Sequence, residues 1–418
     1  MSTAAEQTGR AAARTSHLIP YITLAIGIVG LAIAFALALP VLTEGGQAMA
    51  MGSDMIWGLP VAGYAFLALT SMGVSLVAAT ALLSERTEWH RATPRLFALA
   101  LGLSVGAILV LNLELGNALR SLWAIPTAMQ LRSPLVWMGL AWTAYMVLVI
   151  AVVARLHTVG SDDQLTRRLA VGIIIAGGAA IFTQGLAYGM FVFRPVWYGM
   201  GTPLYFFAGA VASGLAVSLI AAQSVRRFQD RGNSPEWRSI QTYLPAAFGV
   251  ALGVYATVLM ARIVGGLWSP TAGVQVVYLE ILRSPLFWTE TVLGLVIPLV
   301  LMARAAWRVQ PWAQVTAAAL ALIGLFIARY ELTIGGQMVP LFKGTWIPGF
   351  IEYSPNTVEW GIVLVYRTRI PGHPVSMVMP PSAWFQGSRH GPAPATGSHG
   401  APAASPGCTA RASAAGPH

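Results

Sequence analysis

The chain has 418 residues, of which 56% are hydrophobic and only 10% are charged, and its formal net charge is +10. A soluble domain carries about 25% charged residues, so this composition excludes an ordinary water-exposed surface. The basic residues lie in short connections between apolar runs, so the positive charge indicates membrane topology rather than binding to nucleic acid.

Apolar runs of about 20 residues, enough to cross a hydrocarbon layer of roughly 30 Å, recur along the chain. They lack the alternation of barrel strands, so we predict an all-α, polytopic membrane protein with about ten spans. The first run is longer than the apolar core of a signal peptide and is predicted to be retained. The predicted spans are 18–42, 58–82, 96–114, 133–154, 169–192, 201–223, 242–263, 284–303 and 311–329, with a weak tenth beginning near Val358.

The basic residues are divided unequally between the two sides of this topology. Fourteen lie on one side and seven on the other, with the remaining four in the C-terminal region. The positive-inside rule therefore predicts a cytoplasmic N-terminus. Tryptophans gather near the opposite, outer face, where an aromatic interfacial belt and a docking face are both possible interpretations.

The few cysteine and histidine residues limit the possible redox cofactors. Cys408 is the single cysteine, which excludes a four-cysteine iron–sulfur site within this chain. His17, His90 and His157 fall in predicted loops, and the other four histidines follow from His373 onward. We therefore expect no haem or iron–sulfur cluster here, so that any redox cofactor is a diffusible ligand or belongs to a partner.

An internal repeat predicts two parallel four-helix bundles. The sequence LRSPLVW at 131–137 returns as LRSPLFW at 282–288, and YAFLALTSMG at 64–73 is echoed by YFFAGAVASG at 205–214. Each unit has four spans, so both enter the membrane from the same side and the symmetry axis lies along the membrane normal.

This pattern predicts five segments along the chain. They are a cytoplasmic N-terminus with the first span (1–57), a first four-helix unit (58–192), a second unit (193–329), an outer loop with the weak last span (330–370), and a tail (371–418). The tail contains no Leu, Ile, Lys, Asp or Glu, so we interpret it as a disordered or frame-shifted extension.

The repeated Arg-Ser-Pro motif opens one predicted span in each unit, namely spans 133–154 and 284–303. Serine is a good N-cap and proline suits the first helical turn, so Ser133-Pro134 and Ser284-Pro285 are typical of helix starts. Arg132 and Arg283 are disfavoured beside the positive end of a helix dipole, so each needs a partner.

Two carboxylates stand at membrane depth in the predicted topology. Glu114 ends the third span and Glu290 lies within the eighth. Acidic groups in lipid are costly and usually functional, which favours proton handling or ligand contact. For Glu114 a structural ion pair with Arg120 or Arg132 is an equal alternative.

The run Glu114-Leu115-Gly116-Asn117-Ala118-Leu119-Arg120, followed by Ser133-Pro134 and Trp137, resembles the NrfD/PsrC family. That family comprises membrane subunits of polysulfide-reductase-like molybdopterin enzymes, and its pattern is Asp-Leu-Gly-x-Pro-x-Arg before the Ser-Pro. Glutamate replaces aspartate at position 114 and Ala118 replaces proline, so the loop here is expected to differ in shape. The likeness covers roughly residues 18–365.

The resemblance implies a membrane anchor that binds a quinone, such as menaquinone, near the outer face. Electrons would pass between it and an iron–sulfur subunit docked there, with a molybdopterin catalytic subunit beyond. The implied quinone-binding residues are Tyr64, Glu114, Arg120, Arg132 and Trp137, and the implied proton path comprises Glu114, Tyr145 and Glu290. Two alternatives stay open: a secondary transporter with two internal repeats, and a structural anchor whose quinone site has degenerated.

Overall fold

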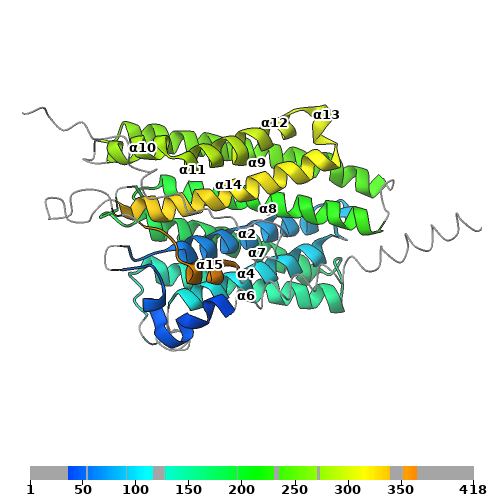
Figure 1. Ribbon diagram of the computed structural model, residues 1–418. Coiled ribbons are helices and arrows are strands. Elements are labelled where there is room, and N and C mark those ends of the chain that lie inside the picture. The colour runs from blue at the N-terminus through cyan, green and yellow to red at the C-terminus, as the bar shows by residue number, and fades with distance from the viewer. Residues whose placement is uncertain are drawn as a thin grey trace, which may run out of the picture. The chain divides into compact units, whose positions relative to one another are not determined.

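The computed structural model describes residues 36–364, except for residues 53–54, 91, 116–126, 128, 195, 230–234, 271–273, 339–350 and 352. All regular secondary structure in this part of the chain is helical, which confirms the predicted all-α fold. Eight of the described helical segments are long and apolar enough to cross a membrane. They run alongside one another in Figure 1. The predicted span 18–42 lies mostly outside the described residues.

The long helices coincide with predicted spans two to nine. They are α2 (Leu59–Leu83), α4 (Thr93–Glu114), α6 (Pro134–Thr158), α7 (Gln164–Gly189), α8 (Gly201–Gln229), α9 (Pro235–Leu267), the composite of α11 (Pro285–Trp288), η2 (Thr289–Val296) and α12 (Ile297–Ala303), and α14 (Pro311–Met338). Short helices are η1 (Gly45–Ala48), α3 (Thr87–His90), α10 (Val274–Arg283), α13 (Ala305–Arg308) and α15 (Thr357–Leu364), the last at the position of the weak tenth span.

Several helices extend beyond the predicted spans, and two of these extensions change the environment of polar residues. Helix α14 continues to Met338 instead of ending at residue 329, because Arg329 is buried and Glu331 is half-buried with a hydrogen bond from Ser284. Helix α6 continues to Thr158, which places His157 in its last turn and not in a loop.

The two sets of four long helices make equivalent neighbour contacts. In the first set α2 packs on α4, α4 on α6, α6 on α7, and α7 on α2. In the second set α8 packs on α9, α9 on α12, α12 and η2 on α14, and α14 on α8. Between the sets, α2 packs on α8, which are the first helices of the two sets. The last helix of each set also packs on the first helix of the other set: α7 on α8, and α14 on α2. These are the contacts that a duplicated four-helix unit requires. The exact division of the chain into units 58–192 and 193–329 stays a prediction.

Helices α2 and α8 approach most closely at one pair of glycines. A Cβ added to Gly73 would lie 1.9 Å from the Ala210 carbonyl oxygen, and one added to Gly214 would lie 2.2 Å from the Gly73 carbonyl carbon. Gly73 and Gly214 end the two copies of the repeated Tyr-to-Gly segment. Equivalent positions of the repeat therefore meet each other, and only the absence of side chains allows the backbones to touch.

The N-terminal ends of α2 and α8 lie at the same end of this helix pair. Trp57, just before α2, stacks on Trp197, just before α8, with ring centroids 5.0 Å apart and an interplanar angle of 21°. Two helices that start side by side and meet again at Gly73 and Gly214 run parallel.

The repeated Arg-Ser-Pro motif forms the same local structure twice, with one difference. The indole N–H of Trp137 donates to the Leu131 carbonyl and that of Trp288 to the Leu282 carbonyl, both at 2.8 Å. Both serines occupy the N-cap position, but only Ser284 makes a capping hydrogen bond with its side chain, which accepts from the Leu286 N–H. Arg283 finds its partner in Glu280, 2.8 Å away.

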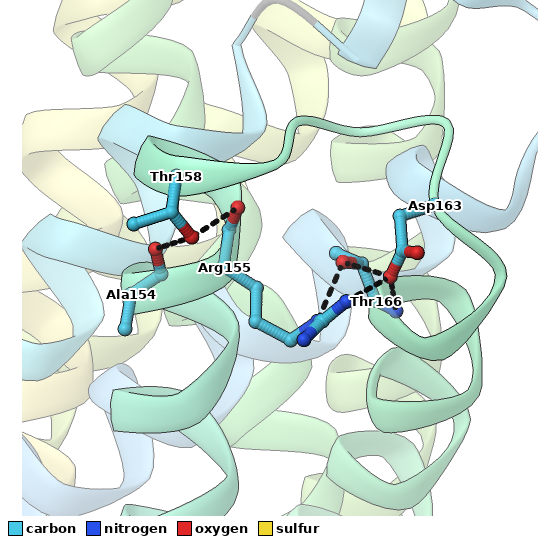
Figure 2. A network of polar contacts seen from close by, with 5 residues as sticks. All are labelled: Ala154, Arg155, Thr158, Asp163 and Thr166. Atoms are coloured by element: carbon cyan, nitrogen blue, oxygen red, sulfur yellow. Dashed lines mark hydrogen bonds and ion pairs between the residues drawn. The ribbon is translucent and has the colours of Figure 1, made fainter.

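The turn between α6 and α7 is held by Asp163 (Figure 2). One of its carboxylate oxygens accepts hydrogen bonds from the Arg155 guanidinium at 2.6 Å, from the Thr166 N–H at 2.9 Å and from the Thr166 hydroxyl at 3.0 Å. Asp163 is thus both the N-cap of α7 and the ion-pair partner of the last turn of α6. The Arg155 hydrogen bond, with the Thr166 N–H, lowers the pKa of Asp163 to about 2.

Candidate functional site

The sequence-predicted quinone residues fall at different depths. Tyr64 is buried in α2, and Glu114, the last residue of α4, is partly buried. Arg132 and Trp137 are exposed at the start of α6, where 52% of Trp137 is accessible. Arg120 lies outside the described residues.

Tyr64 and Glu114 converge with a third group, Tyr188 of α7. Both Tyr188 and Glu114 lie close enough to Tyr64 to act on it electrostatically, and Glu114 acts likewise on Tyr188. Tyr64 of α2 and Tyr188 of α7 are buried, and Glu114 at the end of α4 is partly buried. Tyr64 and Tyr188 carry hydroxyl groups that can donate hydrogen bonds to a ligand oxygen.

Aromatic rings gather beside this group. The Tyr188 ring lies 5.2 Å from both the Trp57 and the Trp197 rings, and the contact with Trp197 is edge-to-face. Phe191 packs against both tryptophans, with ring centroids 5.5 Å from Trp57 and 5.8 Å from Trp197. We name these four residues, Trp57, Tyr188, Phe191 and Trp197, the aromatic cluster.

Gln337 near the end of α14 fixes the aromatic cluster in place. Its side-chain oxygen accepts from the N–H groups of Ile56 and Trp57, both at 3.0 Å, and its amide nitrogen donates to the Trp57 carbonyl at 2.7 Å. The indole N–H of Trp197 donates to the Leu332 carbonyl at 2.6 Å. A Cβ on Gly336 would collide with this indole at 1.7 Å, so glycine is required there.

Tyr145 belongs to a separate polar network in the middle of the first set of helices. Its hydroxyl is hydrogen-bonded to Ser71 at 2.9 Å and to Ser75 at 2.8 Å, and Ser71 donates to the Ala100 carbonyl at 2.6 Å. All three side chains are buried. The network therefore ties α6 to α2 and, through Ser71, to α4.

A second group of ionisable residues lies in the second set of helices. Glu290 of η2, Arg262 of α9, and Arg329 and Glu331 of α14 act on one another electrostatically. Arg262 and Arg329 both lie over the ring of Tyr205, at 4.9 Å and 4.8 Å from its centroid. Arg329 is 2% exposed, and its Nη1 has no hydrogen-bond partner among the described residues.

Glu290 was predicted from the sequence, but Tyr188, Tyr205, Arg262, Arg329 and Glu331 were not included in the predicted site. The repeat could have found Tyr205, because it is the counterpart of Tyr64. Arg262, Arg329 and Glu331 are charges near span ends, where the interface with water is their usual environment. Only the packing shows that they face one another.

Comparison with known proteins identifies this arrangement of helices and buried charges. The model of the family described as Polysulphide reductase, NrfD matches residues 47–341. The chain belongs to the NrfD family. The match covers α2 to α14, so both sets of four helices are part of the NrfD fold.

One relative supports the same class. This NrfD chain is similar to a selenate reductase subunit of Mesobacillus selenatarsenatis, with 24% identity over 365 residues, covering 76% of this chain and 84% of that protein. Family and relative together support a membrane anchor subunit of a reductase complex. Within the described residues no group of His, Cys, Asp and Glu is placed to hold a metal ion.

Proposed function

We propose that this NrfD chain is the quinone-binding membrane subunit of a respiratory reductase complex. It exchanges electrons between the quinone pool, including menaquinone, and an iron–sulfur subunit docked on the outer face, with a molybdopterin catalytic subunit beyond. The family match, the eight candidate spans and the reductase relative support this class of function. They favour it over a secondary transporter. Bound quinone in the purified complex would distinguish it from an anchor with a degenerate quinone site.

The observation that carries the proposal is the convergence of Tyr64, Tyr188 and Glu114 beside the aromatic cluster. A quinone ring needs flat apolar walls and hydrogen-bond donors at its two oxygens. The aromatic cluster offers the walls. The two tyrosine hydroxyls, from α2 and α7, offer the donors.

A bound quinone supplies two-electron, two-proton redox chemistry. In the proposed site Tyr64 hydrogen-bonds one ligand oxygen, and Glu114 holds and releases the proton that accompanies electron transfer. Arg120 and Arg132 stabilise negative charge at the outer side, and Trp137 forms a wall towards the surface. Tyr145 and Glu290 are proposed as further stations of the proton path.

We further propose that the protein lies in a bacterial inner membrane with a cytoplasmic N-terminus, as the distribution of arginines predicts. The four-helix units 58–192 and 193–329 then present the N-terminal ends of α2, α6, α8 and α11 towards the outside. An iron–sulfur partner on that face would be near the proposed quinone site, so that electrons pass without a haem in this chain.

The decisive experiment measures quinone bound to the purified complex together with its quinol-linked activity. Tyr64→Phe and Glu114→Gln are expected to lower bound quinone and activity at least tenfold, the loss of about 1.4 kcal/mol of interaction. Tyr243→Phe is the matched control, because Tyr243 lies at the opposite end of the helices against Arg86. Full quinone content and activity in both site variants would refute the proposed site. Absence of quinone and of an iron–sulfur partner from the purified wild type would refute the function.

A further inference from the structure

Two polar groups stand apart on one face of α2. Tyr64 belongs to the proposed quinone site, whereas Ser71 and Ser75 belong to the hydrogen-bond network of Tyr145. Tyr64 and Ser71 are seven residues apart, which places them on the same face of the helix and about 10 Å apart along its axis. A hydrogen bond spans about 3 Å, so a proton can pass between the two groups only if another group lies between them.

Helix α7 packs against this face of α2 and spans the same gap. A Cβ added to Gly177 would lie 3.4 Å from the Tyr145 ring, so Gly177 stands at the level of the network. Tyr188 acts electrostatically on Tyr64, so it stands at the level of the proposed quinone site. Gln184 lies on the same buried face of α7, one turn from Tyr188 and two turns from Gly177. Its level is therefore that of the gap.

Gln184 carries a polar group that the described residues leave unsatisfied. Its side chain is 2% exposed, and its Nε2 has no hydrogen-bond partner in the described part of the chain. A leucine would fill a similar space without leaving a buried donor unpaired, so an amide at this position costs stability. The unpaired donor indicates a bound partner that the amide holds.

The surroundings of Gln184 favour a water molecule as this partner. Buried waters usually make two to four hydrogen bonds to polar groups of the protein. Hydroxyl groups lie on both sides of Gln184: that of Tyr188 is one turn away on α7, and those of Ser71 and Tyr145 lie towards the middle of the helices. Ala68, one turn before Ser71 on the same face of α2, carries only a methyl group. Helix α2 therefore places no large side chain in the gap.

We propose that Gln184 holds a water molecule that passes protons between the proposed quinone site and the Tyr145 network. The amide Nε2 donates a hydrogen bond to the water oxygen and fixes its position. The water accepts a proton from one side and releases one of its own to the other, and the hydroxyls of Tyr188 and Tyr145 relay in the same way. Water and amide end unchanged, so Gln184 is a positioning residue. The inference rests on the proposed function, because the quinone supplies or takes up the proton.

The experiment replaces Gln184 by methionine, which keeps the length of the side chain and removes the amide. In the purified complex, turnover at saturating quinol is expected to fall about tenfold, with bound quinone and the KM for quinol unchanged. The remaining turnover should show a larger solvent deuterium isotope effect than the wild type, because proton transfer becomes the slow step. A purely structural role would not change this isotope effect. Gln184→Glu, which can still hydrogen-bond the water, should recover most of the turnover.

Thr70→Val is the matched control. Thr70 is 2% exposed, and its hydroxyl also lacks a partner among the described residues. It precedes Ser71 by one residue, so it points about 100° away from the face that carries Tyr64 and Ser71. Turnover of this variant should match that of the wild type. The double variant Gln184→Met with Tyr145→Phe should be no slower than the slower single variant, because both changes interrupt one route.

Unchanged turnover in Gln184→Met, or equal losses in Gln184→Met and Thr70→Val, would overturn the inference and leave the proposed function intact. Loss of bound quinone in Gln184→Met would also overturn it, because Gln184 would then belong to the ligand site. If Gln184→Met fails to assemble, Gln184→Asn decides, since it withdraws the amide by one methylene group and should show the same loss. Absence of quinone from the wild-type complex would instead refute the proposed function, before any variants are compared.

Discussion

Gly73 and Gly214, equivalent residues of the two repeated segments, touch through their backbones where α2 crosses α8. A side chain at either position would force the two sets of helices apart. Gly73→Ala is therefore expected to destabilise the protein by about 1–3 kcal/mol, the usual cost of overpacking. Thermal unfolding of the detergent-purified protein measures the effect. Gly253→Ala in α9 is the control, because its added Cβ meets nothing within 4 Å. Equal stability of the two variants would contradict the close approach.

Gln337 ties the start of α2 to the end of α14. Replacement by leucine removes the acceptor for the N–H groups of Ile56 and Trp57 and the donor to the Trp57 carbonyl. We expect a loss of about 1–3 kcal/mol, because buried backbone groups are left without partners. Bound quinone should fall as well, since Trp57 belongs to the aromatic cluster. The same substitution at the exposed Gln275 of α10 should leave stability and quinone content unchanged.

Tyr145 tests whether the buried hydroxyl network carries protons. Tyr145→Phe keeps the ring and removes the hydroxyl shared with Ser71 and Ser75, so stability should fall by about 1–2 kcal/mol. If the proposed proton path is right, quinol-linked turnover falls severalfold at saturating quinol. The control is Ser104→Ala. It removes the hydrogen-bond partner of Trp142, which lies on α6 as Tyr145 does, and it should lower stability without changing turnover. Unchanged turnover in Tyr145→Phe would assign the network a purely structural role.

Asp163 makes the stability of the α6–α7 turn depend on pH. Its pKa is lowered to about 2 in the folded protein from the ordinary value of 3.8, so its stabilising contribution is complete above pH 3.8 and is lost as the pH falls through 2. Asp163→Ala should therefore lower the melting temperature at neutral pH, and the difference from wild type should shrink below pH 3.8. Asp163→Asn keeps a cap for α7 without the charge, so it should recover part of the loss and show no pH dependence from this site.

The sequence alone determined that this is a membrane protein, and it determined the number of long helices in the described part of the chain. Each of the predicted spans from 58–82 to 311–329 has its helix, because a run of apolar side chains in lipid has no stable alternative to hydrogen-bonding its own backbone. The repeat and the Glu114–Arg120 pattern also predicted the family, which the match over residues 47–341 confirms. These properties are local or periodic, so they can be recognised in the order of the residues.

Only the tertiary structure decided which polar groups meet. Tyr188 joins Tyr64 and Glu114 from a helix more than seventy residues away in sequence, and Arg262 and Glu331 face Glu290 across three helices. Span prediction gives each helix but not its rotation about its own axis, which is set by contacts such as that of Gly73 with Gly214. The rotation decides whether a buried charge faces lipid, a neighbour or a pocket, and so it decides where the candidate sites lie.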